Sequence, residues 1–397
     1  MISESMKAIV KNNSVIREMF EEGKKLVKQY GKENVYDFSL GNPSVEPPVE
    51  VNEAIVEALN DKNIHAYMSN SGFEDVRSEI AHSLNSRFDA ELNEQNIIMC
   101  VGAAGGLNVV LKSILNPDDE VIVLIPYFME YRHYIANQNG KVIEVKCNKN
   151  FEPNMEDLES KISPRTKALI INTPNNPSGI VYSESVIKNL ASILNKKAKE
   201  YNTSIYLLSD EPYREIVYDG TEILYLPKYY KNTLVVYSYS KSLSLPGERI
   251  GYIIVPSEAD DFENLVQAVT ISTRILGFVN APSLLQKVIA KCVDKTADLS
   301  EYKKNRDILY NGLIEIGYEC NKPQGAFYLF LKSPIEDEKE FCKMAKKYNI
   351  LMVPGSSFAC PGYVRLAYCT ETEMIRNSLP KFKELKEEID REGGKFE

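Results

Sequence analysis

A lysine set among small hydroxyl residues is the part of this sequence with the clearest chemical potential. Lys241 lies in the run Ser238-Tyr-Ser-Lys-Ser-Leu-Ser, and Arg249 follows it by eight positions. Hydroxyl groups together with a guanidinium can bind a dianionic phosphate, and a lysine beside such a site can hold a phosphorylated aldehyde as a Schiff base. An exposed loop lysine near the turn at Pro246-Gly247 is the alternative. The choice depends on what the rest of the chain supplies.

Small and polar residues also follow two other predicted strands. Gly102, Ala103 and Ala104 lie where a strand turns into a helix. Backbone N–H groups at such a helix start can bind phosphate, although small residues there also serve close packing. Asn176 lies in the Pro-, Asn- and Gly-rich stretch 172–179, where its amide could donate to a ring oxygen or belong to an ordinary turn. Neither stretch alone establishes a ligand site.

Charged side chains in apolar surroundings indicate buried charge pairs. Asp210 ends an apolar strand, where an unpaired carboxylate is costly. A protonated ring nitrogen would pair with it, and a capping role is the alternative. Tyr213 could donate to the same ring oxygen as Asn176. Arg365 lies within the alternating strand 363–367, where a substrate carboxylate or a structural salt bridge would suit its bidentate guanidinium.

The elements that must position these residues alternate between strands and helices. Continuous apolar strands separated by helical patterns are typical of a mostly parallel sheet covered by helices on both faces. Ligands bind at the carboxyl ends of the strands in such a sheet, and Gly102, Asn176, Asp210 and Lys241 lie shortly after strand patterns. The strand patterns lie at residues 96–101, 120–125, 168–172, 204–208 and 233–237, with a helix around 183–200.

The pattern changes after residue 280. A long helix is predicted from Pro282 towards residue 315. Alternating strand patterns follow, at residues 326–331, 350–353 and 363–367. We therefore expect a large domain over residues 45–280 and a smaller α+β domain built from residues 1–44 and 281–397.

Composition narrows the class of protein. The chain has 397 residues, 44% of them hydrophobic, which is enough for a large core. Its formal net charge of −9 and the lack of a basic block argue against nucleic-acid binding. The seven cysteines and three histidines share no metal-ligand spacing, so we assign no metal and no disulfide framework. With no membrane-length apolar run and no signal peptide, we expect a cytoplasmic protein.

The order of the motifs resembles that of one protein family. The motifs extend from Leu40-Gly41-Asn42-Pro43 to Arg365. Between these ends they follow in a fixed order: a glycine turn, an aromatic residue, Asn-Pro-x-Gly, Asp-x-x-Tyr, and Ser-x-Ser-Lys with a later arginine. This order resembles the class I and II aminotransferases, the aspartate-aminotransferase-like enzymes of fold type I that use pyridoxal phosphate. The resemblance implies a mostly parallel seven-stranded sheet between helices, a smaller α+β domain, and ping-pong transfer of an amino group between an L-amino acid and a 2-oxo acid.

The resemblance also implies a role for each motif. Lys241 would hold the cofactor as a Schiff base and move the substrate's α-proton. Asp210 would keep the ring nitrogen protonated, so that the ring can accept electrons, while Tyr213 and Asn176 would bond the ring's phenolic oxygen. Phe128 matches the position that stacks on the ring, with core packing as the alternative. The phosphate would contact N–H groups around Gly102, Ala103 and Ala104 and the side chains of Ser238, Ser240 and Arg249.

Substrate and partner contacts follow from the same resemblance. Arg365 matches the arginine that holds the substrate's α-carboxylate, with Gly41 and Asn176 beside it. Tyr67 matches a tyrosine that reaches the phosphate of the neighbouring subunit. The resemblance therefore implies a homodimer whose active sites are built at the subunit interface.

The sequence leaves alternatives for two properties: the substrate side chain that the site accepts and the type of reaction. Ala104 stands where some aspartate-specific relatives carry a lysine, and Arg274 could substitute for it from either subunit or make a structural ion pair. A carbon–sulfur β-lyase or another fold type I enzyme with the same cofactor is the second reading. A non-catalytic ligand sensor is the third, but the chain has no spare segment ahead of the first motif and no basic face.

Overall fold

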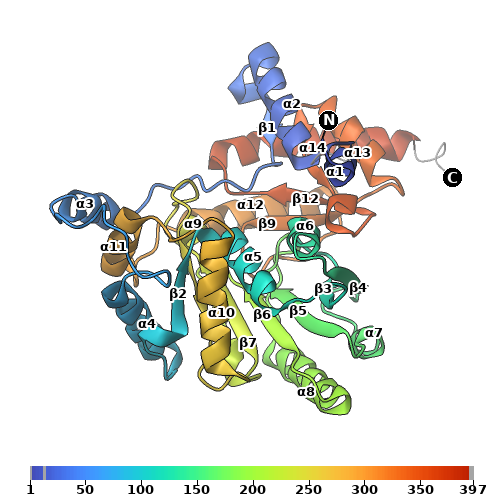
Figure 1. The fold of residues 1–397 in the computed structure, drawn as a ribbon. Helices are drawn as coiled ribbons and strands as arrows, with labels where there is room; N and C mark the ends of the chain where they lie inside the picture. The colour runs from blue at the N-terminus through green and yellow to red at the C-terminus, as the bar shows by residue number, and fades with distance from the viewer. Residues whose placement is uncertain (1, 12–14, 393–397) are drawn as a thin grey trace.

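The structure is a computed structural model of the chain and describes residues 2–11 and 15–392 (Figure 1). A seven-stranded sheet forms its centre, with the strand order β2-β8-β7-β6-β5-β3-β4. Strand β8 pairs antiparallel with both of its neighbours, and the remaining pairs are parallel, which confirms the predicted sheet. The strands are β2 (Ile97–Cys100), β3 (Glu120–Leu124), β4 (Lys141–Val145), β5 (Thr166–Asn172), β6 (Tyr206–Asp210), β7 (Thr233–Ser238) and β8 (Gly251–Ile254).

Helices cover both faces of this sheet. Successive residues of a strand point to opposite faces, and both sets are apolar here, so both faces need a covering layer. Ile170 packs in one cluster with side chains of α5 (Gly102–Ile114) and α10 (Phe262–Ile275). Leu169 and Ile171, its neighbours in β5, belong to a cluster with side chains of α8 (Glu184–Tyr201). The other covering helices are α3 (Val49–Ala58), α4 (Glu74–Phe88), α6 (Glu130–Ala136), α7 (Met155–Lys161) and α11 (Ser283–Cys292).

A second, smaller sheet lies above the first in Figure 1, and we call the two parts the small and the large domain. Its antiparallel strands have the order β11-β12-β9, and a short parallel pair joins β1 to β10. The first part of the chain therefore pairs with a strand of the last part. The elements are α1 (Glu4–Lys11), α2 (Val15–Tyr30), β1 (Tyr36–Asp37), α12 (Ser300–Ile316), β9 (Tyr328–Lys332), α13 (Glu338–Lys346), β10 (Ile350–Leu351), β11 (Val353–Pro354), β12 (Tyr363–Ala367) and α14 (Thr372–Glu392).

The single long helix predicted after Pro282 is wrong. The structure has two helices there, α11 and α12, separated by residues 293–299. Helix α11 packs against α3 and α4, whereas α12 packs against α14. The backbone N–H of Ala297, between them, donates to the carbonyl of Ser242 at 2.8 Å instead of continuing a helix. The break thus lets the chain cross from one packing partner to another and brings its backbone beside the Lys241 segment.

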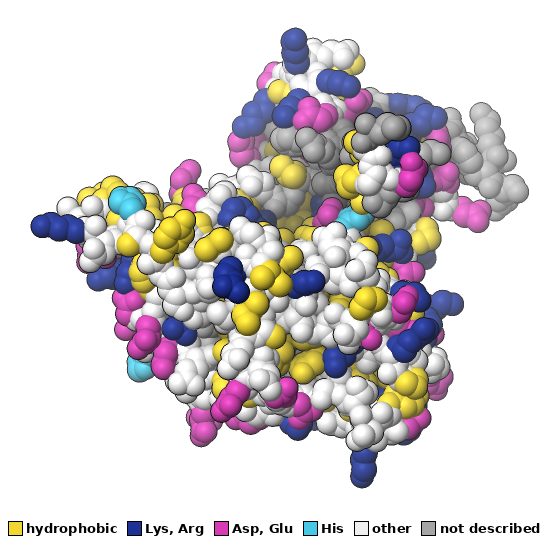
Figure 2. Space-filling model, in the orientation of Figure 1, with side chains coloured by type: hydrophobic (Ala, Val, Ile, Leu, Met, Phe, Trp, Pro, Cys, Tyr) yellow, Lys and Arg dark blue, Asp and Glu magenta, His cyan; other side chains and the backbone are white. Residues whose placement is uncertain are grey.

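The surface in Figure 2 mixes positive and negative side chains, without a block of one sign. Among the described residues, no helix combines the length and the apolar character that crossing a membrane requires. All seven cysteines are free thiols.

Candidate active site

A cavity of about 300 Å³ opens at the carboxyl ends of β5, β6 and β7, where the small domain meets the large one. Parallel strands place residues that are distant in sequence at one edge of a sheet, so the predicted motifs converge there. The lining residues are Leu40, Gly41, Ala103, Ala104, Leu107, Phe128, Tyr131, Tyr134, Asn172, Asn176, Asp210, Pro212, Tyr213, Ser238, Ser240, Lys241, Pro246, Arg249, Tyr328 and Arg365.

One end of the cavity carries hydroxyl groups and a guanidinium. Ser238 ends β7, and its Oγ lies 2.7 Å from Oγ of Ser240. Nη1 of Arg249 donates to Oγ of Ser240 at 3.2 Å. Gly102 begins α5 with a φ of +76°, and a Cβ there would lie 2.6 Å from Nη2 of Arg249. This end can therefore bind a dianion with hydroxyls, a guanidinium and the N-terminus of α5.

Lys241 lies in the short helix α9 (Tyr239–Ser242), directly after β7. Its Nζ donates to the carbonyl of Gly41 at 2.8 Å. Burial, together with the smaller effects of the positive charges of Arg365 and Arg249, lowers the pKa of Lys241 to about 8, although Cys369 opposes the shift. A substantial fraction of this amine is neutral near physiological pH, so it can act as a nucleophile or as a base.

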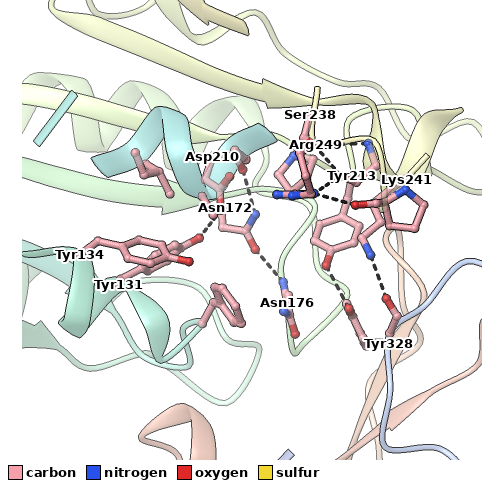
Figure 3. Close-up of a pocket in the computed structure, with 18 of the residues that line it drawn as sticks. Tyr131, Tyr134, Asn172, Asn176, Asp210, Tyr213, Ser238, Lys241, Arg249 and Tyr328 are labelled. Carbon is pink, nitrogen blue, oxygen red and sulfur yellow. Dashed lines mark hydrogen bonds between the residues drawn. The ribbon is translucent and has the colours of Figure 1, made fainter. Parts of the chain in front are cut away.

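Asp210 lies on the other side of the cavity, at the end of β6 (Figure 3). Tyr131 donates a hydrogen bond to its Oδ2, while Oδ1 is buried without a hydrogen-bond partner. The amide of Asn172 donates to the backbone carbonyl of Asp210 at 2.8 Å. Burial raises the pKa of Asp210 to about 7, although the Tyr131 hydrogen bond opposes this shift. A cationic N–H donor would satisfy Oδ1 and favour the ionised carboxylate.

Tyr213 and Asn176 lie between these groups. The hydroxyl of Tyr213 is 2.9 Å from that of Tyr328. The backbone N–H of Asn176 donates to Oδ1 of Asn172 at 2.7 Å. Its own Oδ1 accepts from Nη1 of Arg365 at 3.1 Å, so the NH₂ of this amide is the group left to donate. Two donors, a phenol and an amide, are therefore available to one acceptor in the cavity.

Arg365 is 2% exposed and projects from β12. Its Nη2 donates to the carbonyl of Ser39 at 2.7 Å, and its Nε is buried without a partner. Its Cζ lies 4.5 Å from the ring centroid of Tyr328 and 4.9 Å from that of Phe358. A buried guanidinium held only by neutral groups is a binding site for a carboxylate, because its charge is otherwise uncompensated.

Four charged side chains line this cavity, and among the residues that the structure describes none of them forms an ion pair. They are Lys241, Asp210, Arg249 and Arg365. The set fits pyridoxal phosphate and an amino acid substrate. A phosphate would match the Arg249 end, a ring N–H⁺ would match Oδ1 of Asp210, an aldehyde would match Lys241, and a carboxylate would match Arg365.

Three residues predicted for ligand contact do not line the cavity of their own chain: Gly102, Tyr67 and Arg274. Gly102 directly precedes Ala103, which does line it. Tyr67 is 94% exposed, in the connection between α3 and α4. Arg274 is exposed near the end of α10, and no described acid pairs with it. A role for Tyr67 or Arg274 in the site of a neighbouring subunit stays a prediction.

Tyr131, Asn172 and Tyr328 line the cavity and were missed by the sequence reasoning. Asn172 follows β5 directly, so its place at a strand end was a usable signal. Tyr131 lies one helical turn beyond Phe128, and their rings meet edge to face at 5.8 Å. Tyr328 had no such signal, because it reaches the cavity through the packing of the two domains.

Comparisons with known proteins show what the whole chain is similar to. Residues 33–381 match the family model described as aminotransferase class I and II. The chain is 31% identical to a probable aspartate aminotransferase of Methanocaldococcus jannaschii, over 94% of this chain and 96% of the relative. It is 32% identical to the aspartate/prephenate aminotransferase of Thermus thermophilus, over 87% and 89% of the two chains.

Solved structures show the same likeness. An amino transferase from Eubacterium rectale superposes with a TM-score of 0.96 at 46% identity, covering 98% of this chain and 99% of that one. The aspartate aminotransferase of Thermus thermophilus with maleate has a TM-score of 0.85 at 28% identity, with 97% and 99% covered.

Proposed function

Because this chain belongs to the class I and II aminotransferases, we propose that the cavity around Lys241 binds pyridoxal phosphate and an amino acid together. The chain is an aminotransferase, which moves an amino group between an amino acid and a 2-oxo acid, and its family implies this cofactor. The observation that carries the proposal is the set of four charged side chains in one cavity, none of which forms an ion pair with a described residue. When bound, pyridoxal phosphate supplies a ring that accepts the electron pair of the substrate's α-carbon.

The cofactor would be held at three places. Its phosphate would accept from the N–H groups at the start of α5 and from the Ser238, Ser240 and Arg249 side chains. Oδ1 of Asp210 would accept from the ring N–H⁺, which satisfies an otherwise orphaned buried atom. Tyr213 and the amide of Asn176 would donate to the phenolic oxygen, and Phe128 would cover one face of the ring.

The substrate would be oriented by Arg365. Its guanidinium would bind the α-carboxylate, with Asn176 already bonded to it and Gly41 beside it. Nζ of Lys241 would then remove the α-proton as general base and deliver it to the cofactor, so that the amino group stays there when the 2-oxo acid leaves. A pKa of about 8 allows the amine to do both near neutral pH.

The proposal extends to a homodimer. Apolar side chains gather over α3 and the end of α10, on the face shown in Figure 2. Tyr67 and Leu40 are also exposed, and a second copy of the chain would cover such apolar side chains. The large exposed apolar residues in and directly after these two helices are Val49, Val56, Leu59, Ile271, Ile275, Phe278 and Val279. Free thiols throughout are compatible with the cytoplasmic location that we propose.

A half-reaction screen tests the function. Enzyme loaded with pyridoxal phosphate should convert a suitable amino acid to its 2-oxo acid in a single turnover and stop until a 2-oxo acid acceptor is added. Each amino acid is tested in turn by the absorbance of the bound cofactor. Continuous release of pyruvate and ammonia from cystathionine without an acceptor would contradict transamination and identify a β-lyase.

Substitution of Lys241 tests the placement of the base. Lys241→Ala should lower turnover by about a thousandfold or more, because both the covalent attachment and the proton transfer depend on its amine. Lys228→Ala, at an exposed lysine outside the cavity, should keep wild-type turnover. Full activity of Lys241→Ala would contradict the whole assignment.

A further inference from the structure

The hydroxyl groups of two buried tyrosines meet inside the cavity, and they come from different domains. Tyr213 follows β6 of the seven-stranded sheet, whereas Tyr328 begins β9 of the three-stranded sheet. Their oxygens are 2.9 Å apart, and their rings meet edge to face at 5.6 Å (Figure 3). Among the described residues, this is the hydrogen bond made by the Tyr328 hydroxyl.

The ring of Tyr328 also supports Arg365. In the antiparallel pair of β12 with β9, Arg365 lies opposite Phe330, so Tyr328 is its diagonal neighbour on the same face. The guanidinium lies over the Tyr328 ring at 4.5 Å. Because no described acid pairs with Arg365, the ring is one of its few attractive contacts.

A third contact ties Tyr328 to the segment before the large domain. A Cβ on Gly41 would lie only 2.1 Å from the Tyr328 hydroxyl, so the two residues are packed directly together. The carbonyl of Gly41 is the acceptor for Nζ of Lys241. One side chain therefore touches the proposed partner of the phenolic oxygen, the proposed carboxylate site and the segment that holds the lysine.

We propose that Tyr328 is a positioning residue for the proposed transamination, on which this inference rests: its hydroxyl orients that of Tyr213, and its ring orients the guanidinium of Arg365. Either hydroxyl of the pair can be the donor. When Tyr213 donates to a ligand, Tyr328 can donate to Tyr213, and a chain of two such bonds strengthens the outer donor. Burial raises the pKa of Tyr328 to about 12, so its hydroxyl keeps its proton at neutral pH.

Two substitutions separate the hydroxyl from the ring. Tyr328→Phe removes the hydroxyl alone, and Tyr328→Leu removes both. Tyr318→Phe is the control, because Tyr318 is another buried tyrosine of the small domain, with its hydroxyl bonded to the carbonyl of Phe382. Tyr213→Phe gives the reference for complete loss of the proposed donor.

Two measurements on the loaded enzyme report the two roles without turnover. The first is the pH midpoint of the absorbance change of the bound cofactor. Tyr328→Phe should raise it by about half a unit, because a weaker donor leaves more negative charge on the cofactor ring, and Tyr213→Phe should raise it further. The second is the dissociation constant of succinate or 3-phenylpropionate, which lack an amino group. Tyr328→Leu should weaken this binding about tenfold, and Tyr328→Phe should leave it within about twofold.

The outcomes distinguish this inference from the function beneath it. A wild-type midpoint in Tyr328→Phe, or wild-type carboxylate affinity in Tyr328→Leu, would overturn the positioning role while Tyr213→Phe still shifts the midpoint. An unchanged midpoint in Tyr213→Phe would instead contradict the contact of Tyr213 with the cofactor in the proposed function. Equal shifts in Tyr318→Phe would mean that the loss of any buried hydroxyl is enough, and would also overturn the role of Tyr328.

Discussion

Lys241 and Asp210 line the same cavity, and burial shifts the pKa of each towards neutrality from opposite sides. The pKa of Lys241 is lowered to about 8, and the pKa of Asp210 is raised to about 7. Both shifts arise because a low-dielectric environment disfavours the charged form of either group. A cationic N–H beside Asp210 would favour its carboxylate, so ligand binding and ionisation at this residue are linked.

The Tyr131 hydroxyl should affect the pKa of Asp210 and, through it, the affinity for the cofactor. Tyr131→Phe removes the hydroxyl that stabilises the Asp210 carboxylate, so the pKa of Asp210 rises further above its ordinary value. More of the carboxyl is then protonated at pH 7, and affinity for pyridoxal phosphate should fall about tenfold there. At pH 9 the carboxyl is ionised again and most of the loss should disappear. Titration of the apoenzyme with cofactor across this pH range measures the effect.

The control is Tyr127→Phe. Tyr127 stacks on Tyr131, but its hydroxyl bonds Glu144 rather than Asp210. It should keep the wild-type pH dependence of cofactor affinity. A loss in Tyr131→Phe that is the same at pH 7 and pH 9 would show that packing, not ionisation, is responsible.

At the scale of secondary-structure elements, the site forms where neighbouring strands end. Asn172, Asp210 and Ser238 each end a strand, and β5, β6 and β7 are neighbours in the sheet. Parallel pairing therefore places these three side chains at one edge without any loop of special shape. The start of α5 adds backbone N–H groups, and Gly102 allows the chain to turn there.

Gly102 should be indispensable for two separable reasons. Its φ of +76° disfavours any side chain, and an added Cβ would lie 2.6 Å from Nη2 of Arg249. Gly102→Ala should therefore weaken cofactor binding by about tenfold or more, beyond the backbone strain of ~1 kcal/mol. Gly220→Ala is the matched control, since Gly220 has a φ of +75° with nothing near its Cβ position. Equal effects of both substitutions on cofactor affinity would contradict the steric argument.

At the scale of the molecule, the cavity needs both domains. Arg365 and Tyr328 come from the small sheet, Asp210 comes from the large sheet, and Lys241 comes from α9 directly after β7. In the homodimer that we propose, the working unit would be larger still, because the exposed Tyr67 would meet the neighbouring chain. A residue 94% exposed in one chain can act only where another molecule meets it.

Mixed dimers test whether Tyr67 serves a neighbouring site. Tyr67→Ala and Lys241→Ala should each be impaired alone. Unfolded together in equal amounts and refolded, half of the dimers should be mixed, and each mixed dimer has one site with both native residues. Activity should then reach about a quarter of the wild-type value. Activity equal to the mean of the two parents would contradict a shared site.

The order of the motifs was enough to predict the family and its reaction, and local pattern predicted the strand-end residues Asp210 and Ser238 of the site but not Asn172. Apolar runs followed by Asp210 or by Ser238 and Lys241 predict strands whose carboxyl ends carry polar groups, and the seven-stranded sheet and the family match confirm the fold and the reaction. These features depend on neighbours in sequence, which is why sequence reveals them.

The tertiary structure alone decided the features that depend on packing between distant segments. Tyr131 reaches Asp210 across 79 positions, and Tyr328 reaches Tyr213 across 115. The break between α11 and α12 arises because the two helices pack on different partners, which no local propensity encodes. Burial, too, is a tertiary property. The sequence determined that Lys241 follows a strand beside a phosphate-type motif, and the folded surroundings decided that its amine is partly neutral.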